Sequence, residues 1–385
     1  MGQVIITKLN GGLGVQATSA DGTSGFIFAG VAASIVGGAQ LDTVYELNSL
    51  KDAESLLLNA AYDTANTTVL YRHLKDFYRL NPAGKLYIIL VTATTTAAME
   101  TATDKLVTDS NGEVRTVAVS FADGSAVDAT LATTITALQA KAEGVLSDMD
   151  APIIYLLEGR VLDDSVDLTA LNAPRVAIVA GQDVNISAET ETKYSTLVGL
   201  CLGAIAQKQV HENIGHVQSG NMLGGDLLQA AIGGASFDPS LATNLEAAGY
   251  IFLKQYNGFA GWYWNDSFTC TDKTQDDYYS IENNRVWDKA YRLQRVSMLP
   301  YVNGTVNVDA DTGQLPLEVA KSFEQTARRS LDVMEAAGEI SGAEVFVDPS
   351  QDILSTEELV FASEIVPVGI GRTLRGTIGF TNPLS

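Results

Sequence analysis

Three near-continuous apolar runs constrain the fold of this chain more than any other feature of its sequence. They are Lys85–Val91, Pro152–Leu157 and Arg175–Ala180, and none of them alternates between apolar and polar residues. Such runs are typical of strands buried on both faces, as in a parallel sheet covered by helices. A shorter run, Phe26–Gly30, has the same character. The sequence therefore predicts an α/β fold with a mixed, partly parallel sheet flanked by helices.

Helical patterns lie between and after these runs. Their spacing predicts helices over Leu50–Ala61, with Asn48 as the cap, and over Thr67–Leu80, Thr133–Leu146 and Ser195–Val210. His73 stands alone in the second of these helices, and we expect it to be a surface or cap residue. By contrast, Thr92–Ser125 is rich in Thr, Ala, Asp, Ser and Gly. We expect this segment to be an inserted surface region or hairpin.

The second half of the chain is a different mixture of elements. Two aromatic-rich runs joined through residues 256–258 predict a hairpin, which two helices and two strand-like segments follow. In chain order these are Tyr250–Gln255, Gly261–Cys270, Asn283–Val296, Leu315–Ala337, Leu359–Pro367 and Leu374–Phe380. We expect an N-terminal arm (1–20), an α/β domain (21–240) with an insertion near 92–125, a C-terminal α+β domain (241–364) and a C-terminal arm (365–385).

The charge of the chain excludes several classes of partner. It carries 46 acidic and 24 basic residues, for a net charge of −22. A surface this acidic repels phosphate backbones and anionic lipids, so we expect neither nucleic acid nor a membrane as a partner. Cys201 and Cys270 are too few for a disulfide scaffold, which favours a reducing cytoplasm. Neither has a nearby His or Cys partner in the sequence, and both are expected to be buried.

The two ends of the chain differ from its acidic body. Met1–Ala20 and Ile365–Ser385 contain no Asp or Glu, although their combined length would hold about five at the average of the chain. Both ends read as strands, with an apolar start at Val4, Ile5 and Ile6. At the other end Leu374, Ile378 and Phe380 share one face, and Arg375 lies on the opposite face. Two interpretations remain: edge strands of their own domain, or arms that pair with the acidic bodies of neighbouring subunits.

Few motifs point to catalysis. Gly-x-Ser-x-Gly is absent, and His211 and His216 are five residues apart, not the four that a helical zinc motif requires. Lys8–Gly14 resembles the glycine-rich loop of UDP-sugar pyrophosphorylases, although that loop continues with Thr where this chain has Val15. A nucleotide-binding α/β enzyme is therefore the alternative function. We assign no catalytic, cofactor-binding or metal-binding residue, expect no cofactor and do not expect an enzyme.

Segments along most of the chain resemble the tail sheath proteins of contractile bacteriophages and related contractile injection systems, in particular the Mu-like and Bacteroidetes-type group. In order these are Asp21–Gly30, Val210–Val217, the arginine-bearing helix from Asn284 through Arg295 to Leu299, Gly338–Val347, and the last strands at Ile365–Pro367 and Thr373–Pro383. Their order and spacing, not any single motif, carry the resemblance.

The resemblance implies a structural subunit that polymerises helically around an inner tube by strand exchange of its terminal arms. The polymer would contract and drive the tube through a cell envelope. The implied partners are other copies of the chain, an inner tube protein, and baseplate and tail-terminator proteins. The implied location is the virion tail, after assembly in the cytoplasm of the host bacterium. The inter-subunit arm residues are Val4, Ile5, Ile6, Arg372, Leu374, Arg375, Ile378 and Phe380.

Overall fold

A computed structural model describes residues 20–122, 131–160, 166–187, 194–219 and 229–380. The chain divides into two compact units. The first comprises Met1–Lys208 and Ile214–Tyr279, and the second comprises Gln209–Asn213 and Ser280–Ser385. The predicted organisation places its central boundary after residue 240 and its C-terminal arm from residue 365; that four-part organisation stays a prediction.

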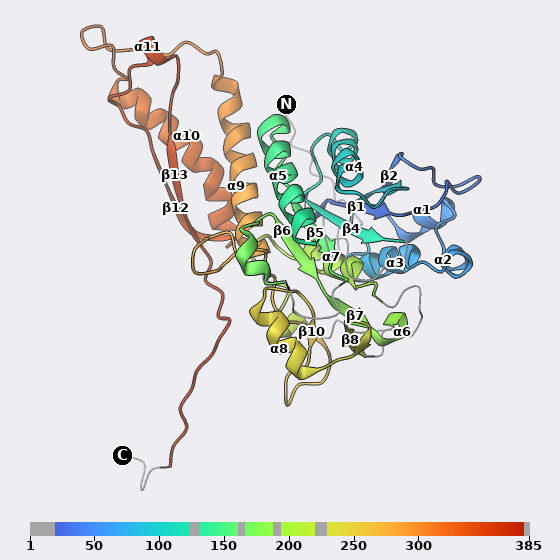
Figure 1. Cartoon of the computed structure of the whole chain (residues 1–385). Coiled ribbons are helices and arrows are strands. Elements are labelled where there is room, and N and C mark those ends of the chain that lie inside the picture. Colours follow the sequence, from blue (N-terminus) through green and yellow to red (C-terminus); the bar gives the residue numbers. More distant parts are fainter. Residues whose placement is uncertain (1–19, 123–130, 161–165, 188–193, 220–228, 381–385) are drawn as a thin grey trace, which may run out of the picture. The chain divides into compact units, whose positions relative to one another are not determined.

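The first unit is built around a six-stranded sheet with the order β2-β3-β1-β4-β5-β6 (Figure 1). The strands are β1 (Ser24–Ala29), β2 (Val44–Leu47), β3 (Leu86–Val91), β4 (Thr116–Phe121), β5 (Ile154–Glu158) and β6 (Val176–Val179). Neighbouring strands run parallel except for β2, which is antiparallel to β3. The predicted fold class, a mixed and partly parallel sheet flanked by helices, is confirmed.

Helices cover both faces of this sheet. On one face α4 (Thr96–Asp109) and α5 (Leu131–Met149) share a core with Ile27 of β1. On the other face α3 (Leu70–Leu80) and α7 (Val198–Gln207) pack against each other, and α7 also contacts β4 and β5. Successive residues of a strand point to opposite faces, so Phe26 and Phe28 turn toward α3, where their rings approach the His73 ring.

The prediction of an inserted surface region at Thr92–Ser125 was wrong. This segment forms α4 and then β4, which lies inside the sheet between β1 and β5. Five of the six β4 residues are buried, including the polar Thr116 and Ser120. Thr and Ser at these positions make an interior strand look like a polar surface segment, and the partners of the Ser120 hydroxyl, His73 and Glu158, are not revealed by the local sequence.

The single helix predicted over Leu50–Ala61 was also wrong. The segment forms two short helices, α1 (Leu50–Ser55) and α2 (Ala60–Asn66). Between them Leu57 adopts a left-handed backbone with φ 61°, which ends the first helix. Asn59, not Asn48, caps a helix here, because its side chain accepts a hydrogen bond from the backbone N–H of Tyr62.

The other predicted elements of the first unit are present. The predicted hairpin appears as a short antiparallel pair, β10 (Leu253–Lys254) with β11 (Tyr263–Trp264). Both cysteines are free and buried, as expected, and burial raises the pKa of each thiol. The remaining elements are η1 (Ala20–Gly22), η2 (Leu168–Leu171), β7 (Gly181–Asp183), α6 (Val184–Ser187), η3 (Val217–Ser219), β8 (Ala230–Ile232), β9 (Ala235–Ser236) and α8 (Pro239–Ala247).

The second unit consists of two helices beside a two-stranded sheet (Figure 1). Its elements are α9 (Ile281–Met298), η4 (Leu299–Tyr301), α10 (Leu317–Ala336), β12 (Ile340–Phe346), α11 (Ile353–Thr356) and β13 (Ala362–Pro367). Residues of both helices and both strands share a core around Leu331 and Met334. Gly338, with φ +72°, provides the turn after α10 that the sequence predicts. Among the described helices of the whole chain, none combines the length and apolar character that a membrane span requires.

Candidate functional site

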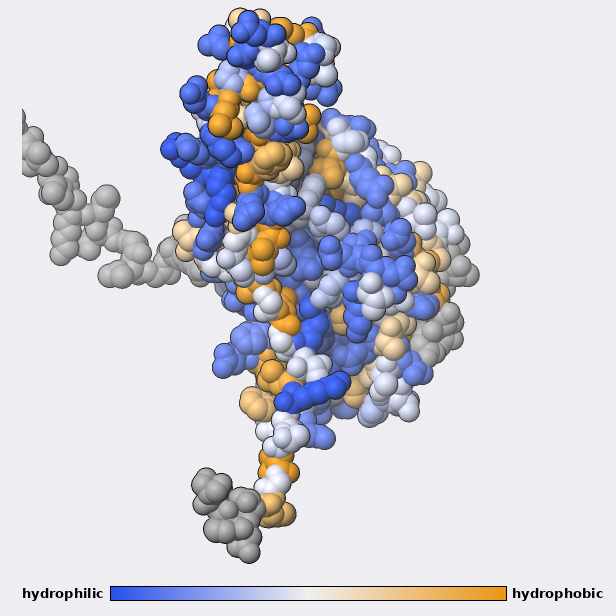
Figure 2. Space-filling model, turned by 90° about the vertical axis from the view of Figure 1, so that its left-hand side faces the viewer, coloured by the Kyte–Doolittle hydropathy of each residue, from blue (hydrophilic) through white to orange (hydrophobic). Residues whose placement is uncertain are grey.

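The segment after β13 is the feature of the second unit that differs most from a folded domain. Residues 368–380 form no helix and no strand and extend away from β13 as a single trace (Figure 1). Within the described residues, the predicted strand over Leu374–Phe380 therefore has no hydrogen-bonded partner strand. Leu374 is 92% exposed, Ile378 103% and Phe380 110%. Figure 2 shows apolar side chains standing in the open along this terminal segment.

Arg372 ties the start of this segment to the second unit. Its guanidinium donates to the carboxylate of Glu282 in the first turn of α9, and the Glu282 side chain is only 2% exposed. The amide of Asn213 donates to the same carboxylate oxygen at 3.1 Å. A charge-assisted bond to a buried carboxylate is stronger than a surface ion pair. The chain is therefore held at Arg372, and Leu374, Ile378 and Phe380 beyond it are not covered by any described residue.

The other predicted arm residues lie in two classes. Arg375 is exposed and makes no hydrogen bond or ion pair within the part of the chain that the structure describes. Val4, Ile5 and Ile6 of the predicted N-terminal arm lie outside the described residues, as does Lys8–Gly14. The alternative of a nucleotide-binding enzyme rests on that glycine-rich run.

The sheet of β12 and β13 is a possible acceptor for such a segment. The two strands are antiparallel, and in the described residues no third strand joins either of them. Ala343, Val345 and Ile365 pack on the core of the second unit. On the other face Phe346 and Val366 are each 58% exposed. An open strand edge presents unpaired N–H and C=O groups in a row, and an extended peptide can add to such an edge.

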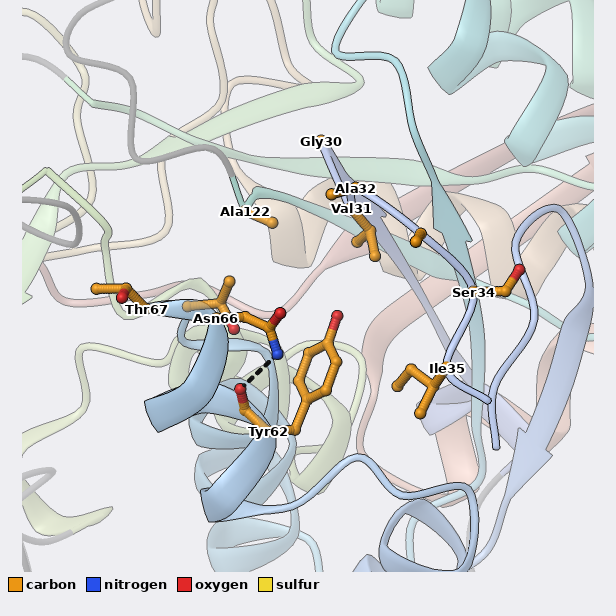
Figure 3. A pocket seen from close by; sticks show the side chains of 11 residues that line it. Gly30, Val31, Ala32, Ser34, Ile35, Tyr62, Asn66, Thr67 and Ala122 are labelled. Atoms are coloured by element: carbon orange, nitrogen blue, oxygen red, sulfur yellow. Dashed lines mark hydrogen bonds between the residues drawn. The ribbon is translucent and has the colours of Figure 1, made fainter. Parts of the chain in front are cut away.

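A pocket of about 510 Å³ lies in the first unit, where β1 and β4 end (Figure 3). Gly30 and Ala122 follow these strands, and the other wall comes from the loop to Ile35 and from the end of α2. Figure 3 shows the side chains of Tyr62 and Asn66 directed into this space. In the sheet, β2 and β3 lie on one side of β1 and β4 to β6 lie on its other side. Open α/β sheets often bind ligands where the strand order reverses in this way.

The chemistry of this pocket is limited by its neutral lining. None of its lining residues is Asp, Glu, Lys, Arg or His. Burial raises the pKa of Tyr62, so its hydroxyl stays protonated at neutral pH. Among the described residues, the pocket therefore offers no charged group to hold a phosphate and no acid–base pair for proton transfer. Nor do the described ranges hold three or more His, Cys, Asp or Glu arranged for a metal ion.

A buried polar network links the sheet to α3 and α7. Glu158 at the end of β5 accepts from the Ser120 hydroxyl at 3.1 Å, the Phe121 N–H at 2.8 Å and the Thr196 N–H at 2.7 Å. Arg160 pairs with the same carboxylate. His73 Nε2 lies 3.0 Å from the Ser120 hydroxyl. His73 is 1% exposed, so its predicted place at the surface was wrong.

The network has the residue types of a hydrolase triad but not its arrangement. In a triad the carboxylate orients the histidine, whereas here Glu158 binds Ser120 and the Nδ1 atom of His73 has no hydrogen-bond partner among the described residues. Burial, followed by the positive charges of Arg72 and Arg160, lowers the pKa of His73 to about 3. A neutral, buried histidine with no access to solvent is a structural link between layers.

The sequence does contain a signal for this burial. His73 shares one face of α3 with Leu70, Leu74 and Phe77, at the i, i+3, i+4, i+7 spacing of an apolar stripe. A second buried link, the ion pair of Arg72 with the fully buried Asp183 at 2.6 Å, joins α3 to β7. No local pattern reveals that pair, because its members lie more than a hundred residues apart.

Comparison with known proteins gives two findings. The family described as "DUF2586, N-terminal domain" matches residues 1–268, and "DUF2586, C-terminal domain" matches residues 277–385. Among solved structures, the chain is similar to one in the "Cryo-EM structure of the anti-feeding prophage (AFP) baseplate, 6-fold symmetrised". The identity is 16% and the TM-score is 0.62, with 100% of this chain and 99% of the other covered. A search of curated proteins gave no match.

The structural similarity shows a shared fold over the whole length of both chains. The likeness to components of contractile systems that the sequence suggests is thereby confirmed at the level of the fold. The gap between the two matched family segments, after residue 268 and before residue 277, lies close to the division between the two compact units after Tyr279.

Proposed function

This chain belongs to the DUF2586 family, and we propose that it is a structural subunit of a contractile tail sheath. Its fold matches that of a chain in the anti-feeding prophage baseplate structure, and its sequence resembles tail sheath proteins. In this proposal the subunit surrounds an inner tube protein as a helical polymer. Contraction of the polymer drives the tube through a cell envelope. Baseplate and tail-terminator proteins contact the two ends of the polymer.

One observation carries the proposal: a terminal segment with a strand pattern has no strand partner in the described part of its own chain. Leu374, Ile378 and Phe380 expose nearly their whole side chains. Leaving three large apolar side chains in water forgoes about 1.5–3 kcal/mol of burial for each. A neighbouring subunit with an open strand edge recovers that burial and also pairs the backbone of the segment.

The proposed contact is heterologous, since the tail of one subunit meets a different surface on the next. Such a contact forms a ring if the rotation between subunits closes. If the rotation does not close, the contact builds an open helical polymer. Gly376 and Gly379 provide backbone freedom between Arg372 and the end of the segment, and Gly369 and Gly371 provide it between β13 and Arg372. Rigid units can then rotate past each other while the strand contacts persist.

A non-enzymatic role in a virion tail is part of the proposal. The pocket, whose described lining is uncharged, and the inaccessible His73–Ser120–Glu158 network support it, because neither places a described reactive group where a substrate could reach it. The second unit instead exposes large apolar side chains at the end of the chain and a two-stranded sheet that no third described strand joins. These are the groups that subunit assembly uses.

The experiment is removal of Leu374–Ser385 from the expressed protein. We expect the intact chain to form long hollow assemblies visible by negative-stain electron microscopy. The truncated chain should stay a folded monomer in sedimentation velocity, since the deleted residues that the structure describes pack on nothing. A truncated protein that assembles at the rate of the intact chain would contradict the proposal.

A matched control separates the tail from apolar surface in general. The test variant replaces Leu374, Ile378 and Phe380 with Ser. The control replaces Val296, Leu317 and Val333, which are exposed on α9 and α10, with Ser. We expect loss of assembly in the first variant and retained assembly in the second.

A further inference from the structure

Glu344 of β12 and Glu364 of β13 lie directly opposite each other in the register of the two-stranded sheet. Both side chains are exposed. Neither carboxylate makes a hydrogen bond or an ion pair with any residue in the described ranges. Like charges at directly opposed positions destabilise a pair of strands. The sheet therefore carries an acidic pair whose repulsion no described residue relieves by a hydrogen bond or an ion pair.

The two faces of this sheet differ in character. Ala343, Val345 and Ile365, the sequence neighbours of the two glutamates, turn inward and pack on the core of the second unit. The glutamates turn outward. Because side chains alternate along a strand, any strand that adds to this sheet with its apolar residues inward presents its other residues on the outer face that carries Glu344 and Glu364.

The tail segment has the complementary pattern. Leu374, Ile378 and Phe380 occupy one face, and Arg375 occupies the other. Arg375 is exposed and has no ion-pair partner in the described part of its own chain, although the unpaired glutamates belong to the same unit. Arg372, the neighbouring arginine, is engaged by Glu282.

From these observations we infer that Arg375 of one copy's tail sets the register of strand addition by pairing with Glu344 and Glu364 of a second copy. The inference rests on the proposed function and names the contact that gives it specificity. The occupant of the acidic outer face is the tail of another copy of this chain. Its apolar residues extend the inner face, and its guanidinium bridges the two carboxylates on the outer face.

The register of this segment needs a specific contact, because backbone pairing and apolar burial alone do not fix it. A slip of one residue would turn Leu374 and Ile378 outward, so the apolar pattern alone excludes it. A slip of two residues keeps the apolar face inward, and Gly-rich strands resist it weakly. Only one register brings Arg375 beside the glutamates. The charge contact adds little affinity at an exposed position. It nevertheless distinguishes registers whose free energies are nearly equal in backbone pairing and apolar burial.

A charge swap in the full-length chain tests the inference. The measured quantity is the critical concentration for assembly, obtained by sedimentation. Arg375→Glu should raise it about fivefold or more, because an attraction becomes a repulsion between opposed side chains. Glu364→Arg alone should also raise it. The double variant R375E/E364R should return it to within about twofold of the wild-type value, since the pair is restored with reversed sign.

Two controls accompany the swap. Arg329→Glu makes the same charge change at an exposed residue of α10 without an ion pair in the described residues, and should leave the critical concentration unchanged. A labelled peptide of residues 368–385 titrated onto the full-length chain gives a second reading. The R375E peptide should bind wild-type chain about fivefold more weakly and should bind the E364R chain better than it binds the wild type.

The outcomes separate this inference from the proposed function. If truncation after Thr373 abolishes assembly but R375E assembles like the wild type, the tail is an arm and the charge register is wrong. The inference also fails if the double variant is no better than the single variants. If truncation itself has no effect, the arm and the register contact both fail.

Discussion

The guanidinium of Arg372 donates to the carboxylate of Glu282, which lies in the first turn of α9 and is only 2% exposed. This pair fixes the point at which the tail leaves the second unit. Three residues later Arg375 is exposed and has no partner in the described ranges. Two arginines of one short segment therefore have different tasks: one holds the segment to its own chain, and the other remains available to another.

The two arginines should respond differently to neutral substitution. Arg372→Gln removes a charged donor from a buried carboxylate and should lower the free energy of unfolding of the second unit by about 1–3 kcal/mol. Arg375→Gln should change it by less than about 0.5 kcal/mol, because an exposed and unpaired residue contributes little. Urea unfolding followed by tryptophan fluorescence, to which Trp287 of α9 contributes beside Trp262 and Trp264 of the first unit, measures both. Equal effects of the two substitutions would contradict the assigned anchor.

The close packing of α7 on α3 gives a second prediction. A Cβ added at Gly199 would lie 2.5 Å from the backbone oxygen of His73. Backbone cannot yield as a side chain can, so Gly199→Ala should destabilise the first unit by about 1–3 kcal/mol. Gly144 in α5 has no atom within 4 Å of its added Cβ, and Gly144→Ala should stabilise by about 0.5–1 kcal/mol. Opposite shifts of the urea midpoint are the expected result, and a loss of stability in both variants would count against the packing argument.

A strand buried on both faces is a continuous apolar run, which can be recognised in the sequence without knowing its distant partners. For this reason β3, β5 and β6 were predictable. The strand β4 was not, because its buried Ser120 is polar. Its hydroxyl is satisfied by His73 and Glu158, which lie 47 and 38 residues away. Local composition cannot show such partners, so a central strand was predicted as a surface insertion.

The candidate site was predictable in part for a related reason. The alternation of Leu374, Arg375 and Ile378 indicates a strand whether or not a ladder exists in the single chain. The structure adds what alternation cannot provide. The pairing of Glu344 with Glu364 depends on the register of two strands joined by a long connection that contains α11. The engagement of Arg372 by Glu282 spans 90 residues.

Buried His73 predicts a pH dependence of stability. Its pKa is about 3 in the folded chain and about 6.5 in an unfolded one, so below pH 6.5 only the unfolded chain takes up the proton. This contribution to stability is complete above pH 6.5 and is lost as the pH falls toward 3. Asp63 and Asp76 act oppositely, because burial raises the pKa of each to about 6 and the folded chain then binds protons more readily.

Comparison with His73→Gln isolates the histidine. Glutamine keeps a polar partner for Ser120 and removes the titration. Between pH 7.5 and pH 5 the wild-type chain should lose about 2 kcal/mol of unfolding free energy relative to this variant, whatever the aspartates contribute to both. Urea unfolding at each pH measures the difference. Parallel pH curves for the two proteins would show that His73 is not held neutral by the fold.

Salt dependence tests how much of the assembly contact is electrostatic. The tail contains Arg375 and no acidic residue, and the body of the chain is strongly acidic. The Debye screening length shortens from about 10 Å at 0.1 M salt to about 3 Å at 1 M salt. The critical concentration for assembly should therefore rise over this range in the wild type and rise less in Arg375→Gln. Sedimentation at several salt concentrations compares the two slopes. Equal slopes of critical concentration against salt in the two proteins would assign the salt effect to other charges. Assembly that strengthens with salt would mean that apolar burial and strand pairing carry the contact.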